Sequence, residues 1–217
     1  MSSRTHSRLP GDLWHPGDEL CDTEERWSVE LSERRYDDGF VTVRADKVRA
    51  PDGETFQRSI VEHPGAVGIL ALDEAEHVLL LRQYRHASGA RLLELPAGVC
   101  DVADEPPGET AVRELHEEAS LKAKDWRLML DVAPTPGSST EWWRIYVARA
   151  LEPVAVAERH RPEHEEADMT AVWVPLDEVV TAIVQRRLTD GMAGLAALAA
   201  QQSRDGAGLD SLPPVVG

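Results

Sequence analysis

The sequence has few cysteines, a deficit of positive charge and no long apolar run, and each shortage argues against a class of protein. Cys21 and Cys100 are the only two cysteines among 217 residues. They lie far apart and outside any metal-binding spacing, so we expect free thiols in a reducing cytoplasm. Lys and Arg number 23 against 39 Asp and Glu, for a formal net charge of -16. Phosphate backbones are bound by excess basic residues, so this balance argues against nucleic acid as a partner.

Membrane and zinc-binding classes are disfavoured in the same way. No apolar stretch approaches the roughly 18 residues of a membrane span, and the polar start Met1 to His6 has no signal-peptide pattern. Without a cluster of soft ligands, a zinc site is not expected. We therefore expect a soluble cytoplasmic protein with no membrane partner, whose length fits one domain, or one domain with an N-terminal appendage.

Hydrophobic patterns predict many strands and few helices. Alternating or apolar runs predict strands near 27–33, 40–48, 55–61, 66–72, 77–84, 126–132, 142–149 and 169–174. Helices are predicted over 109–121, from Pro175 to about residue 187, and in a last Ala/Leu segment capped by Thr189 or Asp190. This mixture predicts an α+β fold.

One helix carries the most informative cluster. Glu114, Glu117 and Glu118 are three and four residues apart, so an α-helix presents all three carboxylates on one face. Hard oxygen ligands of this kind suit Mg²⁺ or Mn²⁺. The alternative is a solvated acidic helix face with local basic partners.

The residues around the cluster form a longer motif. Gly98, Glu105 and the run Arg113-Glu-Leu-His-Glu-Glu-Ala-Ser-Leu121 give the spacing G-x6-E-x7-R-E-L-x-E-E-x-S-L. It resembles the Nudix box, G-x5-E-x7-R-E-U-x-E-E-x-G-U, where U is aliphatic. Two departures are an extra loop residue before Glu105, where insertions are tolerated, and Ser120 in place of a helix-ending glycine. Neither removes a carboxylate.

The resemblance implies an architecture and a metal site. Nudix proteins are α/β/α sandwiches around a mixed sheet, and the alternating segments before residue 62 predict an N-terminal antiparallel sheet ahead of that sandwich. We expect a flexible arm over 1–24, an N-terminal β subdomain for dimerisation over 25–62, the hydrolase domain over 63–202 and a flexible tail over 203–217. The expected ligands of Mg²⁺ or Mn²⁺ are the carbonyl of Ala97 with Glu114, Glu117 and Glu118. Glu105 and Arg113 are expected to brace the fold by pairing.

Motifs outside the box resemble the ADP-ribose pyrophosphatase branch. They are Arg82-Gln-Tyr-Arg85, Glu94-Leu-Pro-Ala-Gly98, Pro136 with Gly137 past the box, and the acidic run His164-Glu-Glu-Ala-Asp-Met169. The branch implies hydrolysis of ADP-ribose to AMP and ribose 5-phosphate. A loop glutamate, Glu165 or Glu166, would activate the water. The alternative for this loop is a charged surface segment.

The same resemblance implies substrate contacts, some of them from a second subunit. They are Arg58, Arg85, Val99, Glu141, Phe40, Pro136 and Gly137. Phe40 would stack on adenine, although a strand phenylalanine also fits a core, and the two arginines would bind phosphate or ribose. Pairing with a carboxylate is the alternative for both arginines, and it fits Arg58 better than Arg85. Phe40, Pro136 and Gly137 would reach a partner's site, which predicts a homodimer.

Other functions stay open at this point. A Nudix enzyme for another nucleoside diphosphate sugar, flavin or dinucleotide would carry the same box. A catalytically silent Nudix nucleotide sensor is the alternative from another class, and an acidic scaffold is a third. Intact carboxylates and the acidic loop favour the enzyme.

Overall fold

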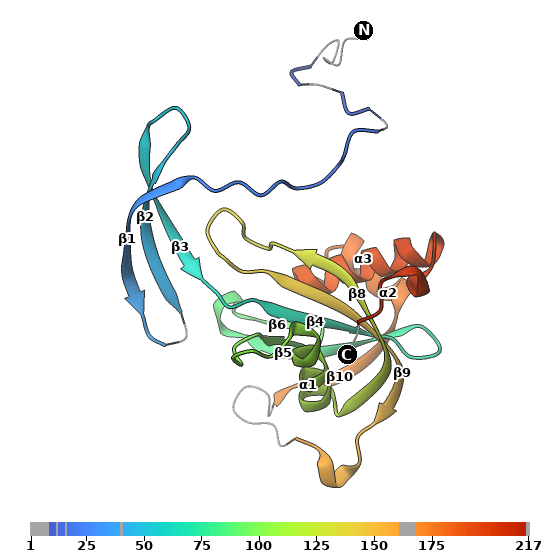
Figure 1. Cartoon of the computed structure of the whole chain (residues 1–217). Helices are drawn as coiled ribbons and strands as arrows, with labels where there is room; N and C mark the ends of the chain where they lie inside the picture. The colour runs from blue at the N-terminus through green and yellow to red at the C-terminus, as the bar shows by residue number, and fades with distance from the viewer. Residues whose placement is uncertain (1–8, 12, 16, 40, 161–167, 216–217) are drawn as a thin grey trace.

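The computed structural model describes residues 9–11, 13–15, 17–39, 41–160 and 168–215. Figure 1 shows the elements in their chain order. The strands are β1 (Ser28–Asp37), β2 (Thr42–Arg49), β3 (Thr55–Glu62), β4 (Ala66–Ala71), β5 (His77–Arg85), β6 (Ala90–Glu94), β7 (Ala97–Val99), β8 (Leu121–Val132), β9 (Trp143–Pro153) and β10 (Thr170–Pro175). The helices are α1 (Pro107–Ala119), α2 (Leu176–Val184) and α3 (Gly191–Asp205), with short 3₁₀ turns η1 (His86–Ser88), η2 (Val156–Glu158) and η4 (Leu209–Ser211).

The strands form three sheets. β1, β2 and β3 make an antiparallel sheet that stands apart from the rest of the protein in Figure 1. The order β10-β5-β6 makes a second antiparallel sheet, and β7-β4-β9-β8 makes a third. In the third, β4 runs parallel to β9 and antiparallel to β7, so this sheet is mixed, as expected.

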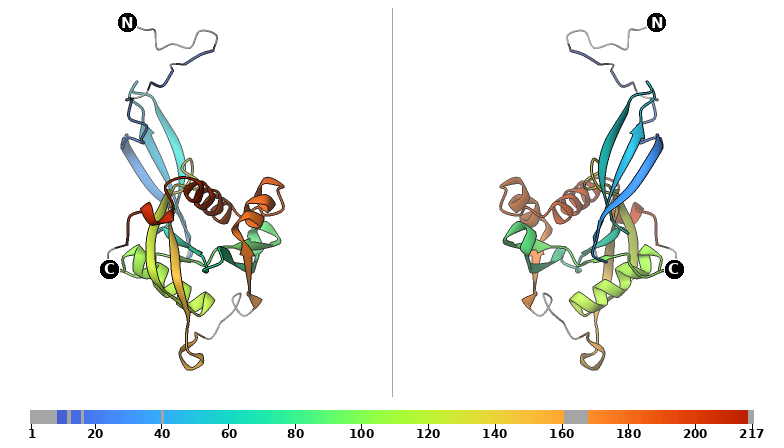
Figure 2. Two further views of the ribbon diagram at one scale, coloured as in Figure 1. Left: turned by 90° about the vertical axis from the view of Figure 1, so that its right-hand side faces the viewer. Right: turned by 90° about the vertical axis from the view of Figure 1, so that its left-hand side faces the viewer.

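Strand β4 is buried on both faces and divides the core in two. Ile69 and its same-face neighbours pack in one cluster with Ala111 and Leu115 of α1. Leu70 packs in the other cluster with residues of α2 and α3. Successive side chains of a strand point to opposite faces, so the helices cover the two sides of the sheets. The α/β/α sandwich is confirmed, and Figure 2 shows α1 on the opposite side of the sheets from α3.

The box helix forms where the glutamate spacing predicts it. It begins at Pro107, two residues earlier than expected, because proline suits the first helical turn, where its missing N–H is not needed. It ends at Ala119, since Ser120 takes left-handed angles (φ 52°, ψ 41°) at the position where the family pattern has glycine. Leu115 is fully buried under the helix. The adjacent face of the helix is thereby left to the glutamates.

Other expectations need correction. The short strands β6 and β7 are not evident from the sequence pattern, and β8 begins at Leu121 instead of Trp126. The described part of the expected tail, residues 203–215, packs on the domain: the N–H of Val215 donates to the carbonyl of Trp126 at 3.0 Å, and Leu209 is buried. No helix in the described ranges is both long and apolar enough to cross a bilayer.

Candidate active site

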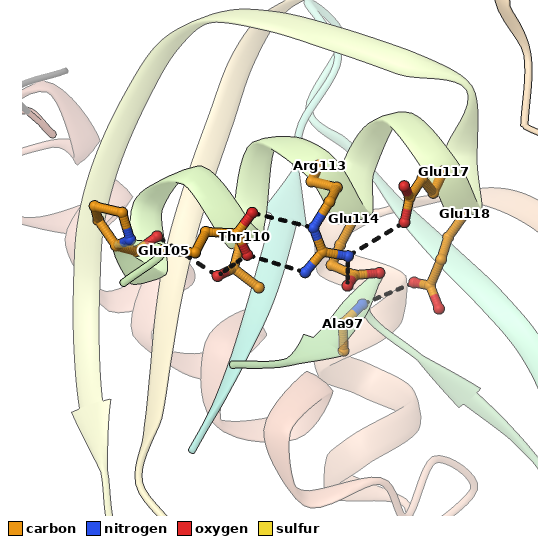
Figure 3. Close-up of polar contacts among 8 residues, drawn as sticks. Ala97, Glu105, Thr110, Arg113, Glu114, Glu117 and Glu118 are labelled. Atoms are coloured by element: carbon orange, nitrogen blue, oxygen red, sulfur yellow. Dashed lines mark hydrogen bonds and ion pairs between the residues drawn. The ribbon is translucent and has the colours of Figure 1, made fainter. Parts of the chain in front are cut away.

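The acidic face of α1 lies against strand β7. Glu118 and Glu114 approach this strand from successive turns of the helix, as Figure 3 shows. The backbone N–H of Ala97 donates to Oε2 of Glu118 at 2.9 Å. Glu118, an expected metal ligand, is therefore held by Ala97, whose carbonyl is another expected ligand.

Gly98 makes the approach of Glu114 possible. A Cβ atom at Gly98 would lie 2.1 Å from Oε1 of Glu114, a separation that no side chain can adopt without displacing its neighbour. A residue without a side chain is the only one that leaves room for the carboxylate at its present place. The glycine of the box loop thus leaves room for Glu114 of the helix.

Arg113 ties the carboxylates of the box together. Its guanidinium donates to Glu105 at 3.1 and 3.3 Å, to Glu114 at 2.6 Å and to Glu117 at 3.2 Å. The predicted pairing of Glu105 with Arg113 is confirmed. Hydrogen bonds from Arg113 and from Thr110 lower the pKa of Glu105, and those to Glu105 raise the pKa of Arg113 further above its already high value. Glu105 is thereby held as a carboxylate beside a fixed positive charge.

These residues line an acidic cleft of about 710 Å³, within the usual size range of small-molecule sites. Seven of the predicted site residues line it: Arg85, Ala97, Val99, Glu114, Glu117, Glu118 and Glu141. They come from β5, β7, α1 and the segment before β9, which are distant in the sequence. The structure thus brings into one cavity most of the residues that the resemblance singles out.

Arg85 supplies positive charge to the cleft. It forms a two-pronged ion pair with Glu94, with Nε at 3.0 Å from both carboxylate oxygens and a terminal nitrogen at 2.7 Å from Oε2. The bond to Glu94 raises the pKa of Arg85. Pairing with a carboxylate was the alternative for both arginines and fitted Arg58 better. It is Arg85 that forms such a pair, and Arg85 also lines the cleft.

The other predicted residues lie elsewhere. Arg58, on β3, stacks its guanidinium 4.3 Å from the ring centroid of Phe56 and does not line the cleft. Pro136 and Gly137 lie in the loop after β8, which bonds to β3 through the N–H of Val61 and the carbonyl of Ser138 at 2.8 Å. Phe40, Glu165 and Glu166 lie outside the described residues.

Some cleft residues were not predicted. Gln83 and Asp190 line the cleft, the latter also capping α3 by accepting from the N–H of Ala193 at 2.7 Å. Burial raises the pKa of Asp190. Gln83 lies within the quoted Arg82-Gln-Tyr-Arg85 run, and alternation with Arg85 on one strand face would have identified it. Asp190 was expected only as a cap, because its cleft position depends on tertiary packing.

The donor chemistry of the cleft fits a hard divalent cation. Three carboxylates from one helix line it, and Gly98 leaves space for the first of them. In the described part of the chain, however, no three acidic, histidine or cysteine side chains are already arranged around one point. Arg113 holds Glu114 and Glu117 instead, so an arriving ion would replace the guanidinium as their partner.

The fold is an α/β/α sandwich, and the carboxylates of helix α1 line its main cleft. Most of the site is thus built on one loop and one helix. The chain belongs to the NUDIX domain family, whose model matches residues 62–196. This match includes the whole box and every residue that lines the acidic cleft.

Related proteins support the assignment. An ADP-ribose pyrophosphatase of Mycobacterium tuberculosis is 43% identical over 162 residues, covering 75% of this chain and 77% of that protein. A methanol dehydrogenase activator of Bacillus methanolicus is 29% identical over 165 residues, covering 76% and 87%. Among solved structures, an ADP compounds hydrolase superposes with a TM-score of 0.72 at 20% identity, covering 87% of this chain and 99% of that one, which shows the shared fold.

Proposed function

We propose that the protein hydrolyses ADP-ribose to AMP and ribose 5-phosphate, using Mg²⁺ or Mn²⁺ held by the acidic cleft. The observation that carries the proposal is the convergence of Glu114, Glu117 and Glu118 with Arg85 around one cavity of about 710 Å³. The substrate is proposed from the ADP-ribose pyrophosphatase that is 43% identical to this chain.

Each group in the cleft has a task in this reaction. Hydrolysis of a phosphoanhydride needs positioning and charge neutralisation more than covalent chemistry. A divalent ion, when bound, supplies positive charge that offsets the diphosphate and makes water more acidic. The ion would be held by the carboxylates of Glu114, Glu117 and Glu118 and by the carbonyl of Ala97. The guanidinium of Arg85 binds a phosphate oxygen pair or the terminal ribose, and Val99 and Glu141 contact the substrate.

The proton acceptor is proposed to be Glu165 or Glu166. The supporting observation is their position in the sequence, two or three residues before Asp168 and shortly before β10. Glu165→Gln and Glu166→Gln, made separately, should identify the base by a collapse in kcat. Glu158→Gln is the matched control, because Glu158 is an exposed carboxylate paired with Lys122 at 3.1 Å. Full rates in both loop variants would place the base elsewhere.

The active protein is proposed to be a homodimer with shared sites, joined through the subdomain at 25–62. The first strand of this subdomain exposes Val29, Leu31 and Tyr36, and its third strand bonds to the loop that carries Pro136 and Gly137. Phe40 and that loop would then contact substrate in the partner's cleft, with Arg58 nearby. Sedimentation at micromolar concentration should report a dimer. A monomer with full activity would contradict the shared sites.

A panel of substrates tests the function itself. ADP-ribose, ADP-glucose, a flavin dinucleotide and a diadenosine polyphosphate are incubated with Mg²⁺ or Mn²⁺, and both products are identified. ADP-ribose should turn over fastest and give AMP and ribose 5-phosphate. Faster turnover of another substrate would favour a different Nudix hydrolase, and tight binding without turnover would favour a nucleotide sensor. The described cysteines are free, which supports placing the reaction in the cytoplasm.

A further inference from the structure

A second cavity, of about 330 Å³, is rich in arginine although the chain is strongly acidic. It lies where the β5–β6 hairpin meets the chain after α2, two segments that lie side by side in Figure 2. Its lining consists of Arg82, Ala90, Arg91, Leu92, Leu93, Arg187, Leu188 and Thr189. The lining thus holds three arginines and no carboxylate in a protein of net charge -16. We call this cavity the arginine pocket.

The strand register places two of the arginines on one face. Arg82 of β5 pairs with Leu93 of β6, and Tyr84 pairs with Arg91. Arg82 and Arg91 are therefore diagonal neighbours across the two strands, with Cβ atoms roughly 7–8 Å apart. Arg187 joins them from the turn that follows α2. Like charges at this spacing repel unless an anion lies between them.

The three guanidinium groups are only partly satisfied. Arg91 pairs with the exposed carboxylate of Asp168, and Nε of Arg187 donates to the side chain of Gln185 at 2.9 Å. Arg82 is exposed, and its side chain forms no hydrogen bond or ion pair with another described residue. A neighbouring cavity shares Arg187 and includes the carboxylate of Glu178. Each of the three guanidinium groups therefore keeps N–H donors that a ligand could use.

The arginine pocket is separate from the acidic cleft. On β5, Leu80 packs with the core under α2 and α3, and Arg82, two residues on, lies on the same face of the strand. Gln83 and Arg85 lie on the opposite face and line the acidic cleft. Leu92 lines both cavities, so a single strand separates them.

We propose that Arg82, Arg91 and Arg187 form a second binding site, for a phosphate monoester dianion. Guanidinium groups bind phosphate oxygens in pairs, and a dianion neutralises the charge that the three side chains concentrate. Leu93, Leu188 and Thr189 provide apolar and hydroxyl contacts, and the volume admits a small organic group such as a pentose. The site goes beyond the proposed hydrolysis and does not depend on it.

Binding without metal tests the proposal. The whole protein in EDTA, where hydrolysis is stopped, is titrated calorimetrically with inorganic phosphate and, in a second series, with ribose 5-phosphate. Both should bind saturably at one site, and Arg82→Gln and Arg187→Gln should each weaken binding about tenfold. Tighter binding of ribose 5-phosphate would assign the pocket to the phosphorylated sugar. Equal binding would assign it to the phosphate group.

Two controls separate this site from the cleft and from general charge effects. Arg85→Gln removes the arginine of the acidic cleft, and Arg35→Gln removes an exposed arginine of β1. Arg35→Gln should keep wild-type affinity for both ligands, and Arg85→Gln should keep it for inorganic phosphate. Thermal unfolding checks that every variant is folded. Absence of saturable binding would overturn the proposal. So would binding that is lost in Arg85→Gln but kept in Arg82→Gln.

Discussion

Gly98 and Glu114 are in such close contact that the backbone of one defines the position of the other. A Cβ atom added to Gly98 would meet Cδ and Oε1 of Glu114 at 2.1 Å and its Cγ at 2.4 Å. The loop and the helix of the box are therefore fitted to each other at one point. Neither can be altered there without moving a proposed metal ligand.

Gly98→Ala should impair activity more than it impairs folding. The added methyl group forces Glu114 out of its position, so metal affinity and kcat should both fall by about tenfold or more. Metal titration of activity and circular dichroism separate the two effects. Gly191→Ala is the matched control, because a Cβ atom there meets nothing within 4 Å. Equal losses in both variants would show that the contact has no special role.

Glu118→Gln should abolish most turnover while leaving the protein folded. The amide oxygen can still accept from the N–H of Ala97, which now donates at 2.9 Å, but the charge that would hold a cation is lost. We expect kcat to fall at least about 100-fold, with little change in thermal unfolding. Glu109→Gln, at an exposed position in the first turn of the same helix, should stay close to wild type. A near-normal rate for Glu118→Gln would remove the metal assignment.

Ser120→Gly should stabilise the protein. Ser120 adopts φ 52° at the end of α1, where an L-residue other than glycine is strained. Relief of that strain, less the greater chain entropy of glycine when unfolded, should raise the free energy of unfolding by about 0.5–1 kcal/mol. Denaturant unfolding measures the change. Ser203→Gly, inside α3, should do the reverse because glycine weakens a helix interior.

Asp190→Asn should become relatively more stabilising as pH rises. Burial raises the pKa of Asp190 above its ordinary value of 3.8, so the folded state holds that proton more tightly than the unfolded state. The wild type therefore loses stability as pH rises from below 3.8 through the raised pKa. Asparagine can still cap α3 but has no such titration.

Denaturant unfolding from about pH 3 to 8 should show the difference between Asp190→Asn and wild type growing with pH and then levelling off. Asp52→Asn, in the exposed turn between β2 and β3, controls for the loss of one negative charge. A constant difference across the range would contradict the assigned cause.

The box could be predicted because its signal is local. Helical spacing alone places Glu114 and Glu118 on one face, and the family pattern adds the loop glycine. The partner of Arg85 could not be predicted in this way: Glu94 lies on another strand, and the β5–β6 register places it on the same sheet face as Arg85, within reach of the long side chain. Short strands such as β7 offer too few residues for a periodic pattern. Contacts of this kind depend on tertiary packing.

The chain end illustrates the same limit. The Gly, Asp and Pro content after Ser203 predicts a frayed tail, yet Leu209 is buried and the segment bonds to β8. Composition describes the local preference of a segment, whereas the burial of one leucine depends on a surface formed elsewhere in the chain. The packing of this segment therefore could not be predicted from its composition.

The guanidinium of Arg113 has a consequence for the supply of ions. Because its positive charge already offsets part of the charge of Glu105, Glu114 and Glu117, the acidic helix can fold without a bound cation. Under the proposed function, binding of a divalent ion would replace the guanidinium as the partner of Glu114 and Glu117. Removal of the ion would return these carboxylates to Arg113 and leave the architecture intact.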